Sequence, residues 1–414
     1  MTTTDWSERT LGEVASRLTV RNRGTSANVL TISAKVGLVN QEKYFNKSVA
    51  SRNLDNYFLL ERGDFAYNKS HSTGYPLGVV RRLERYDSGV VSPLYICFRP
   101  NPDANVDPDF LLHFFAGGGF DNDLRQIAKQ GARNHGLLNV KASEYFDMRA
   151  CFPPLPEQER IAEILESVDE AIQATKAVID QTRKVKQGLL QQLLTRGIGH
   201  TRFKQTEIGE IPDSWDLVPL IELVPPERPI AYGVLKPGPF VADGTPMLRI
   251  MDIRGGRVNL EGVHLISAEL DHGFRRTRLV GGETVISLVG TIGLTARVPE
   301  SLAGANLHRN LGRIAPGARL DSHYLACAMG SPCIREQIVR ATKGGNQPLL
   351  NLGDVKQLLL PTPSLAEQRV LANKLEAVED ALESSSAEHR LLIRLKSGLI
   401  SDLLSARVRV EVDA

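Results

Sequence analysis

The sequence predicts an α+β protein made of two tandem copies of one unit, each copy an α/β domain followed by one long helix. An internal repeat predicts the duplication, and two segments with coiled-coil spacing predict the helices. Short β-type runs separated by Gly, Pro, Asn and Asp clusters assign the remaining residues to the two α/β domains.

The repeat is clearest in two stretches that share one constant offset. Pro153–Ile161 (PPLPEQERI) recurs as Pro363–Leu371 (PSLAEQRVL), and Lys186–Thr195 recurs as Lys396–Ser405. Weaker matches extend the repeat into both α/β domains, and they include one tryptophan and one Leu-Leu-Asn triplet in each copy. The resulting division is two α/β domains at 1–152 and 199–360, and two helical segments at 153–198 and 361–410.

Both helical segments have the pattern of a long coiled-coil helix. Glu157–Thr195 contains no proline, and its apolar residues recur at alternating spacings of four and three. A helix of this length spans about 60 Å at 1.5 Å per residue and cannot bury its apolar stripe alone. The predicted seam residues are Ile161, Leu165, Val168, Ile172, Leu189 and Leu193 in the first copy, and Leu371, Leu375, Val378, Leu382, Leu399 and Leu403 in the second.

The partner of each helix is expected to be the other copy, in an antiparallel pair with pseudo-twofold symmetry. Both stripes turn polar near their middle, at Thr175 and at Ser385 with His389, and these polar layers are expected to meet. His389 is therefore assigned to the seam and not to catalysis. Lys186 and Lys396 are expected to extend along the seam edge with their ammonium groups in solvent.

The two α/β domains are expected to carry many exposed loops. β-type runs occur at 246–253 and 283–289, and helical stretches occur at 108–130 and 321–341, each before one copy of the Leu-Leu-Asn triplet. Loops on such a scaffold are where recognition usually takes place.

Composition bounds the class of protein. With 42% hydrophobic and 24% charged residues, the chain of 414 residues is typical of a globular protein. It has no apolar run long enough to span a bilayer and no signal-peptide pattern, so we expect a cytoplasmic protein without membrane contact. The four cysteines form no CxxC pair, so no metal site is expected. The net charge of +2 lies mainly in the two α/β domains and is only weak support for nucleic-acid binding.

No catalytic motif is present. The segment 63–70 resembles a phosphate-binding loop but lacks the glycine before Lys69, and no Asn/Asp-Pro-Pro-aromatic motif of an amino-methyltransferase occurs. Asp121 and Asp123 are expected to lie in a solvated loop or helix cap. The sequence therefore predicts no catalytic residue and no metal ligand.

Three stretches of the chain resemble the specificity subunits of type I restriction–modification enzymes: Pro-Leu-Pro-Glu157-Gln158-Glu-Arg-Ile, Lys186-Gln-Gly-Leu-Leu-Gln-Gln-Leu-Leu, and Gly-Glu-Ile-Pro-Asp-Ser-Trp215. With the second copies of the first two, the resemblance covers essentially the whole chain. It implies two target-recognition domains held apart by an antiparallel pair of helices. Each domain would read one half of a bipartite, asymmetric site in double-stranded DNA, without catalysis by this chain.

The resemblance also implies partner subunits. Two methyltransferase subunits would dock on this chain, and restriction (motor) subunits would join them to allow cleavage. S-adenosylmethionine, ATP and magnesium would be cofactors of those partners, and this chain would bind none of them.

The side chains expected to bind DNA are polar residues in Gly-containing loops. In the second domain Arg outnumbers Lys, and arginine can bind guanine through two hydrogen bonds. Arg275, Arg276 and Arg278 are expected either to contact phosphates or to be simple surface residues. The expected DNA-binding residues are Asn68, Lys69, Ser70, His71, Arg133 and Asn134 in the first domain, and Ser287, Thr291, Arg309, Asn310, Lys343, Asn346 and Gln347 in the second.

Two alternatives remain open at the level of sequence. The chain could belong to a system that methylates and never cleaves, or be part of a fused type II enzyme. It could also be a coiled-coil adaptor whose two domains bind proteins. A steep fall of DNA affinity with salt would distinguish DNA binding from the adaptor.

Overall fold

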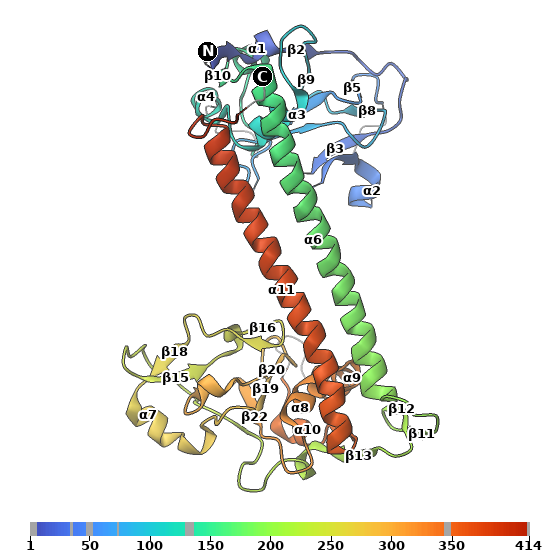
Figure 1. Ribbon diagram of the computed structural model, residues 1–414, viewed down its shortest axis with the longest axis vertical. Helices are drawn as coiled ribbons and strands as arrows, with labels where there is room; N and C mark the ends of the chain where they lie inside the picture. Colours follow the sequence, from blue (N-terminus) through green and yellow to red (C-terminus); the bar gives the residue numbers. More distant parts are fainter. Residues whose placement is uncertain are drawn as a thin grey trace. The chain divides into compact units, whose positions relative to one another are not determined.

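The chain divides into two compact units, each with one α/β domain and half of each long helix (Figure 1). The computed structural model describes residues 6–33, 36–46, 53–72, 74–128, 136–342 and 349–411. Unit 1 is Met1–Thr175 with Glu388–Ala414, and unit 2 is Lys176–Ala387. The long helices are α6 (Leu155–Arg196) and α11 (Leu365–Leu403), and we call residues 6–152 the first head and 199–360 the second head. Within the described residues, no helix has both the length and the apolar character needed to cross a membrane.

The first head is built on an antiparallel four-stranded sheet, and its aromatic core includes Phe65, Phe98 and Phe110. The sheet has the order β2 (Ala15–Leu18), β9 (Ile96–Pro100), β6 (Phe65–Asn68) and β7 (Val79–Arg82). The remaining elements are the strand pairs β1 (Ser7–Thr10) with β10 (Arg149–Phe152), β3 (Leu30–Ser33) with β4 (Gly37–Asn40) and β5 (Phe58–Glu61) with β8 (Ser88–Val91), and the helices α1 (Leu11–Val14), α2 (Gln41–Phe45), α3 (Pro108–Ala116), α4 (Asp121–Ile127) and α5 (Ala142–Phe146).

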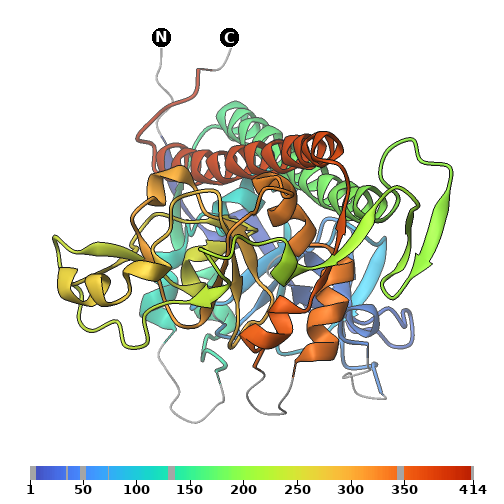
Figure 2. The same cartoon turned by 90° about the horizontal axis from the view of Figure 1, so that it is seen from below.

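The second head repeats the four-stranded sheet, in the order β14 (Ala231–Tyr232), β22 (Leu311–Ile314), β19 (Thr284–Ser287) and β20 (Thr295–Arg297). Figure 2 shows the β11–β12 hairpin (light green) projecting from this head on the side away from α7 (gold). The other elements are β11 (Phe203–Thr206), β12 (Gly209–Pro212), β13 (Asp216–Pro219), η1 (Leu220–Glu222), β15 (Thr245–Leu248), η2 (Ile250–Asp252), β16 (Ile253–Arg254), β17 (Arg257–Val258), β18 (His264–Ile266), α7 (Ala268–Gly273), η3 (Arg275–Thr277), η4 (Glu300–Leu302), β21 (Asn306–Leu307), α8 (Ser322–Met329), α9 (Pro332–Ala341), α10 (Leu352–Lys356) and β23 (Leu359–Thr362).

One turn shows how closely the two sheets correspond. In the first head the Asp64 carboxylate accepts a hydrogen bond from Glu61 N (2.7 Å), and in the second the Glu283 carboxylate accepts one from Val280 N (2.9 Å). The glycine before each acid has a positive φ, of 92° at Gly63 and 77° at Gly282. The Gly-Asp and Gly-Glu pairs therefore close the same turn before the central strand of each sheet.

One predicted strand is shorter than its sequence pattern. The run 246–253 continues as a strand only to Leu248 and then turns through η2 into β16. The Asp252 carboxylate accepts a hydrogen bond from Arg249 N (2.7 Å) and pairs with the Arg249 guanidinium (2.8 Å), which closes this turn. Capping by a side chain three residues ahead overrides the apolar β pattern.

Helices α6 and α11 pair antiparallel within each unit. In unit 1, Lys396 Nζ lies 2.5 Å from the Asp169 carboxylate, and in unit 2, Lys186 Nζ lies 2.6 Å from the Glu379 carboxylate. The repeat offset relates Asp169 to Glu379 and Lys186 to Lys396, so these are two copies of one ion pair. Each lysine is half-buried and meets a carboxylate of the facing helix, a partner that the sequence did not predict.

The apolar face of the pair is covered as a coiled-coil seam requires. In each helix the predicted seam residues nearest the helix ends are buried or half-buried, and those toward the middle are half-buried. Near the middle, Thr175 Oγ1 lies 3.2 Å from His389 Nδ1, so these two polar residues meet as expected. A polar contact of this kind fixes the register of a helix pair at little gain in stability.

Each long helix is joined to its head by one buried glutamine. Gln368 accepts a hydrogen bond from Asp321 N (2.8 Å) and donates to the carbonyls of Arg319 and Pro363 (2.9 Å each). Gln158 does the same at the start of α6 with Asp107 N (2.9 Å) and the carbonyls of Asn105 and Pro153. Asp107 and Asp321 are the N-caps of α3 and α8, so each amide fixes a long helix to a helix of its head.

The glutamate before each glutamine joins two further segments. Glu367 accepts a hydrogen bond from Trp215 Nε1 (3.0 Å) and lies 2.7 Å from His200 Nε2. Glu157 accepts one from Trp6 Nε1 (3.3 Å) and pairs with Arg409 (2.8 Å). The repeated Glu-Gln dipeptide therefore organises the junction of head and helix in both units.

We expect Gln368→Leu to lower the free energy of unfolding of unit 2 by about 3 kcal/mol, because three buried backbone groups lose their partner. The measurement is chemical denaturation followed by fluorescence in a Trp6→Phe background, where Trp215 is the remaining tryptophan. Gln187→Leu, at an exposed position of α6, is the control and should change the midpoint little. Equal effects of the two substitutions would contradict the anchoring role.

Candidate nucleic-acid interface

In both heads the central strand of the sheet runs into a loop that pairs with the Leu-Leu-Asn segment. In the first head, Leu138 N donates to Lys69 O (2.9 Å) and His71 N donates to Gly136 O (2.7 Å). In the second head, Leu350 N donates to Leu288 O (2.9 Å). The repeated triplet therefore holds the loop after β6 and the loop after β19 in the same way.

The residues of the first head that the sequence assigns to DNA binding differ in how much of each side chain is exposed. Asn68 Oδ1 accepts a hydrogen bond from Ser70 N (3.1 Å), which tightens the turn after β6. Lys69 is half-buried, its Nζ lies 3.4 Å from Val140 O, and burial lowers its pKa. His71 is exposed at the end of the turn. His71 is thus better placed than the half-buried Lys69 and Ser70 to meet a ligand from solvent.

In the second head, Ser287 is fully buried at the end of β19. Its Oγ donates to Thr291 O (2.5 Å) and accepts from Leu294 N (2.8 Å). This hydroxyl closes the loop between β19 and β20 and does not lie on the surface. Thr291, at the far side of the same loop, is exposed.

Arg309 and Asn310 lie on a rigid turn that precedes β22. Arg309 N donates to Val234 O (2.9 Å), and Leu288 N donates to Asn310 O (2.8 Å). Asn310 N donates to His308 Nδ1 (3.3 Å), so this nitrogen is an acceptor and the ring is neutral there. Burial, with help from Arg309 and Arg249, lowers the pKa of His308 and favours that neutral form. The exposed Arg309 guanidinium is therefore presented from a fixed backbone.

The sequence pattern missed two exposed residues beside this turn. Tyr232 and Leu235 are 47% and 48% exposed, and they flank the segment that contacts Arg309. Gly233 allows this approach, because a Cβ there would lie 1.7 Å from Leu307 O. The available signal was a glycine between an aromatic and an apolar residue, but the contact joins segments distant in the chain. Tyr232 and Leu235 offer an aromatic and an apolar surface next to the arginine.

Five predicted DNA-binding residues lie outside the described residues: Arg133, Asn134, Lys343, Asn346 and Gln347. In the chain they directly precede the two Leu-Leu-Asn segments. Their assignment stays a prediction from the sequence, as does the assignment of the other candidates to DNA.

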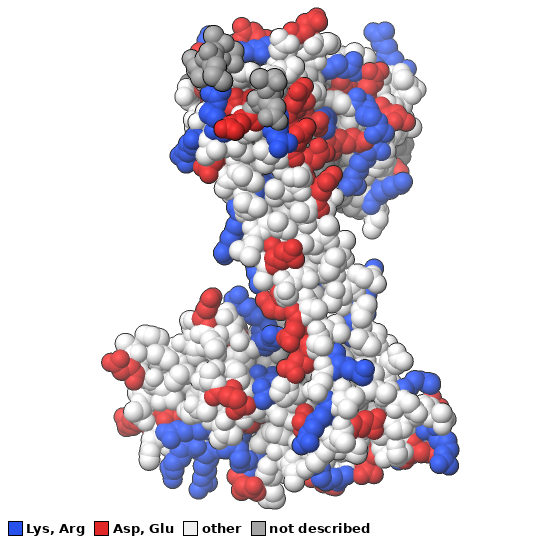
Figure 3. Space-filling model, in the orientation of Figure 1, with Lys and Arg blue, Asp and Glu red and all other residues white. Residues whose placement is uncertain are grey.

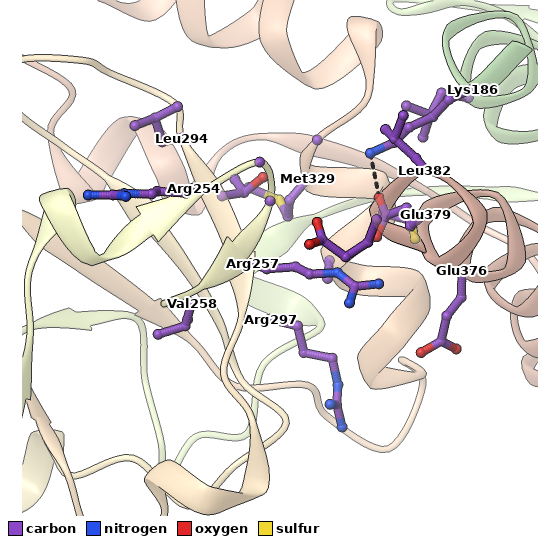
Figure 4. A pocket seen from close by; sticks show the side chains of 18 of the residues that line it. Lys186, Arg254, Arg257, Val258, Leu294, Arg297, Met329, Glu376, Glu379 and Leu382 are labelled. Atoms are coloured by element: carbon purple, nitrogen blue, oxygen red, sulfur yellow. Dashed lines mark ion pairs between the residues drawn. The ribbon is translucent and has the colours of Figure 1, made fainter. Parts of the chain in front are cut away.

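A groove of about 1030 Å³ in unit 2 is lined by α6, α11, the β16–β17 hairpin and α8 (Figure 4). Side chains of both charges line it. Arg257 lies 2.6 Å from the Asp380 carboxylate, and Lys186 lies 2.6 Å from the Glu379 carboxylate. None of the described residues that the sequence assigns to DNA binding lines this groove. We therefore take the loops at the sheet end as the candidate interface.

No group of three or more His, Cys, Asp or Glu side chains among the described residues is arranged to hold a metal ion. Burial raises the pKa of the Cys97 and Cys327 thiols to about 12, so these thiols are protonated near neutral pH. The arrangement suits recognition by exposed loops on two similar frameworks.

The chain is similar in sequence to curated specificity subunits. It is 26% identical over 292 residues to the MjaVIII type I restriction enzyme specificity subunit of Methanocaldococcus jannaschii, covering 68% of this chain and 67% of that protein. It is 27% identical over 275 residues to the EcoBI specificity subunit of Escherichia coli, covering 63% of this chain and 58% of that one. No protein-family model matches the chain.

Two solved structures share the fold over nearly the whole chain. The type I restriction–modification S subunit from M. genitalium has a TM-score of 0.57 at 14% identity and covers 98% of this chain and 97% of its own. A chain from a study of complex assembly and conformational transition of the type I system has a TM-score of 0.57 at 16% identity, with 97% and 98% covered. At these identities the likeness shows the fold.

Gly233→Ala is expected to destabilise the second head by about 3 kcal/mol, since the new methyl group would overlap the Leu307 carbonyl. Thermal unfolding measures the change. Gly353→Ala is the matched control, because a Cβ at that helical position meets open space and alanine favours a helix. An unchanged melting temperature for Gly233→Ala would show that Tyr232–Leu235 does not lie against the Arg309 turn.

Proposed function

We propose that this chain, a homologue of the specificity subunits of type I restriction enzymes, recognises a bipartite and asymmetric site in double-stranded DNA. Each head would read one half of the site. The observation that carries the proposal is that the two heads share one framework and differ in the loops it presents. A duplicated framework with unlike loops suits two unlike short sequences.

The loops at the sheet end supply different chemistry in the two heads. The first head presents His71 after its central strand, whereas the second presents Thr291 after its central strand and Arg309 on the turn that contacts the Tyr232–Leu235 segment. Arginine binds the O6 and N7 atoms of guanine through two parallel hydrogen bonds in the major groove. Hydrophobic side chains can contact the thymine methyl group. Two half-sites of different sequence follow from this difference.

The chain would act as a non-catalytic part of an adenine-methylating and ATP-dependent cleaving complex. Two methyltransferase subunits would dock on it, and restriction subunits would complete the assembly. S-adenosylmethionine, ATP and magnesium would be bound by those partners. An adenine must leave the duplex to be methylated, so each head must leave room for a methyltransferase beside its half-site.

The proposal is tested by co-expressing the chain with its methyltransferase subunit in a host without DNA methylation and mapping modified adenines across the genome. The expected result is one bipartite motif methylated on both strands, and no methylation with the methyltransferase subunit alone. A stable complex that modifies no motif would contradict the proposal and favour an adaptor. A contiguous motif would contradict the assignment of one half-site to each head.

Arg309→Ala is expected to relax the motif at one guanine of one half-site. Loss of a two-hydrogen-bond contact costs about 1–3 kcal/mol, or roughly 5- to 150-fold in discrimination. The measurement is the base frequency at each motif position in the methylation map. Arg340→Ala removes an exposed arginine of α9 that pairs with Glu336 and should leave every position unchanged. A uniform loss of methylation with the motif unaltered would show that Arg309 contacts only the backbone.

A further inference from the structure

A buried arginine distinguishes the second head from the first. Arg313 lies in β22 and is 1% exposed. It pairs with Val285 of β19, as Cys97 pairs with Ala66 of β6 in the first head. Because β6 and β19 are equivalent strands, a guanidinium stands where the first head has a thiol. Burying a cation costs free energy unless hydrogen bonds and opposite charges compensate it, so the partners of Arg313 are of interest.

The Arg313 guanidinium binds backbone carbonyls of two separate segments. It donates to the carbonyls of Arg276 (3.0 Å) and Arg278 (3.3 Å), and to that of Pro229 (3.1 Å). The carboxylate beside it, Glu283, pairs with Arg228, whose guanidinium also donates to Arg278 O (3.2 Å). Burial and the neighbouring Arg228 lower the pKa of Arg313. Two guanidiniums thus stand beside one carboxylate.

Three of the five carbonyls in the segment Phe274–Arg278, which we call the basic turn, are held by buried side chains. Besides the two that Arg313 binds, Phe274 O accepts a hydrogen bond from Asn306 Nδ2 (3.2 Å). Thr277 Oγ1 donates to Asn306 Oδ1 (2.9 Å). The backbone of the basic turn is therefore fixed from inside the head.

The side chains of the basic turn are not equivalent. Arg278 pairs with the buried Asp271, so its charge is already compensated. Arg275 and Arg276 are exposed, and no carboxylate of the described residues pairs with either. Figure 3 shows blue side chains gathered on the second head near the place of α7 in Figure 1. Adjacent cations without acidic partners repel each other, and an anion bound between them would relieve that repulsion.

We propose that the basic turn binds the DNA backbone beside the half-site of the second head, with Arg275 and Arg276 as phosphate contacts and Arg313 as the residue that positions them. This inference rests on the proposed function. Phosphate contacts fix a protein on the duplex without reading sequence. The contact belongs to the second head alone, because the equivalent stretch of the first head, Asp55–Leu59, has no arginine or lysine and begins with an acid.

The first test is the double substitution Arg275→Ala/Arg276→Ala in the complex with the methyltransferase. Binding of a duplex that carries the mapped motif is measured from low to high salt. The slope of log affinity against log salt should fall by about 1 to 2, because each lost phosphate contact accounts for about 0.9. The motif should stay the same, and ethylation interference should be lost at phosphates beside the second half-site only.

The control is Arg202→Ala/Lys204→Ala, which removes the same charge from the β11–β12 region on the other side of the second head (Figure 2). It should leave the slope and the interference pattern unchanged. If the arginine double substitution also left both unchanged while the wild-type complex bound its motif, the inference would be overturned and the proposed function would stand. If the wild-type complex bound no motif, the proposed function itself would fail.

The positioning role is tested with Arg313→Met, which removes a buried charge and leaves the Arg228–Glu283 pair intact. The expected result is a reduced salt slope and loss of the same phosphate interference, with the motif retained. The melting temperature should fall, because three carbonyls lose their buried donor, so binding is measured well below the unfolding transition. Cys97→Ala at the equivalent position of the first head should change neither the slope nor the interference. A wild-type slope and pattern for Arg313→Met would remove the positioning role.

Discussion

The structure depends on one buried amide at the start of each long helix. Gln158 and Gln368 each join three backbone groups, and those groups belong to the head and to the helix entrance. An amide can donate and accept at once, which no hydrophobic side chain can do. Because the junction occurs twice with equivalent partners, both heads start from the same local geometry. The ion pairs of Lys186 and Lys396 repeat that equivalence along the helices.

The two heads share one framework and differ in only part of it. Both sheets have the same strand order, the same turn before the central strand and the same pairing with Leu-Leu-Asn. What changes is the chemistry at the end of the sheet and beneath the basic turn. A framework shared in this way can keep its stability while its loops diverge, since most surface substitutions change stability little. The loops can therefore change without loss of the fold that carries them.

The sequence predicted the fold class and the two helices well. The alternating spacing of apolar residues placed a helix at 157–195, and α6 runs from Leu155 to Arg196. The sequence pattern did not predict contacts between segments that are far apart in the chain. The partners of Lys186 and Lys396 lie on the facing helix, and the approach of Gly233 to Leu307 joins segments far apart in the chain. Arg313 was missed because arginine is mostly a surface residue. The domain boundaries and the DNA-binding residues stay predictions.

The buried guanidinium of the second head limits how its surface can be exchanged for another. A graft that replaced the 274–278 segment but kept β22 would leave Arg313 without two of its carbonyl partners. In a graft that moved the segment onto the first head, Cys97 would occupy the position of Arg313. It would offer no guanidinium to the carbonyls of residues 276 and 278. The 274–278 segment and β22 therefore have to be exchanged together, with both boundaries of the graft outside them.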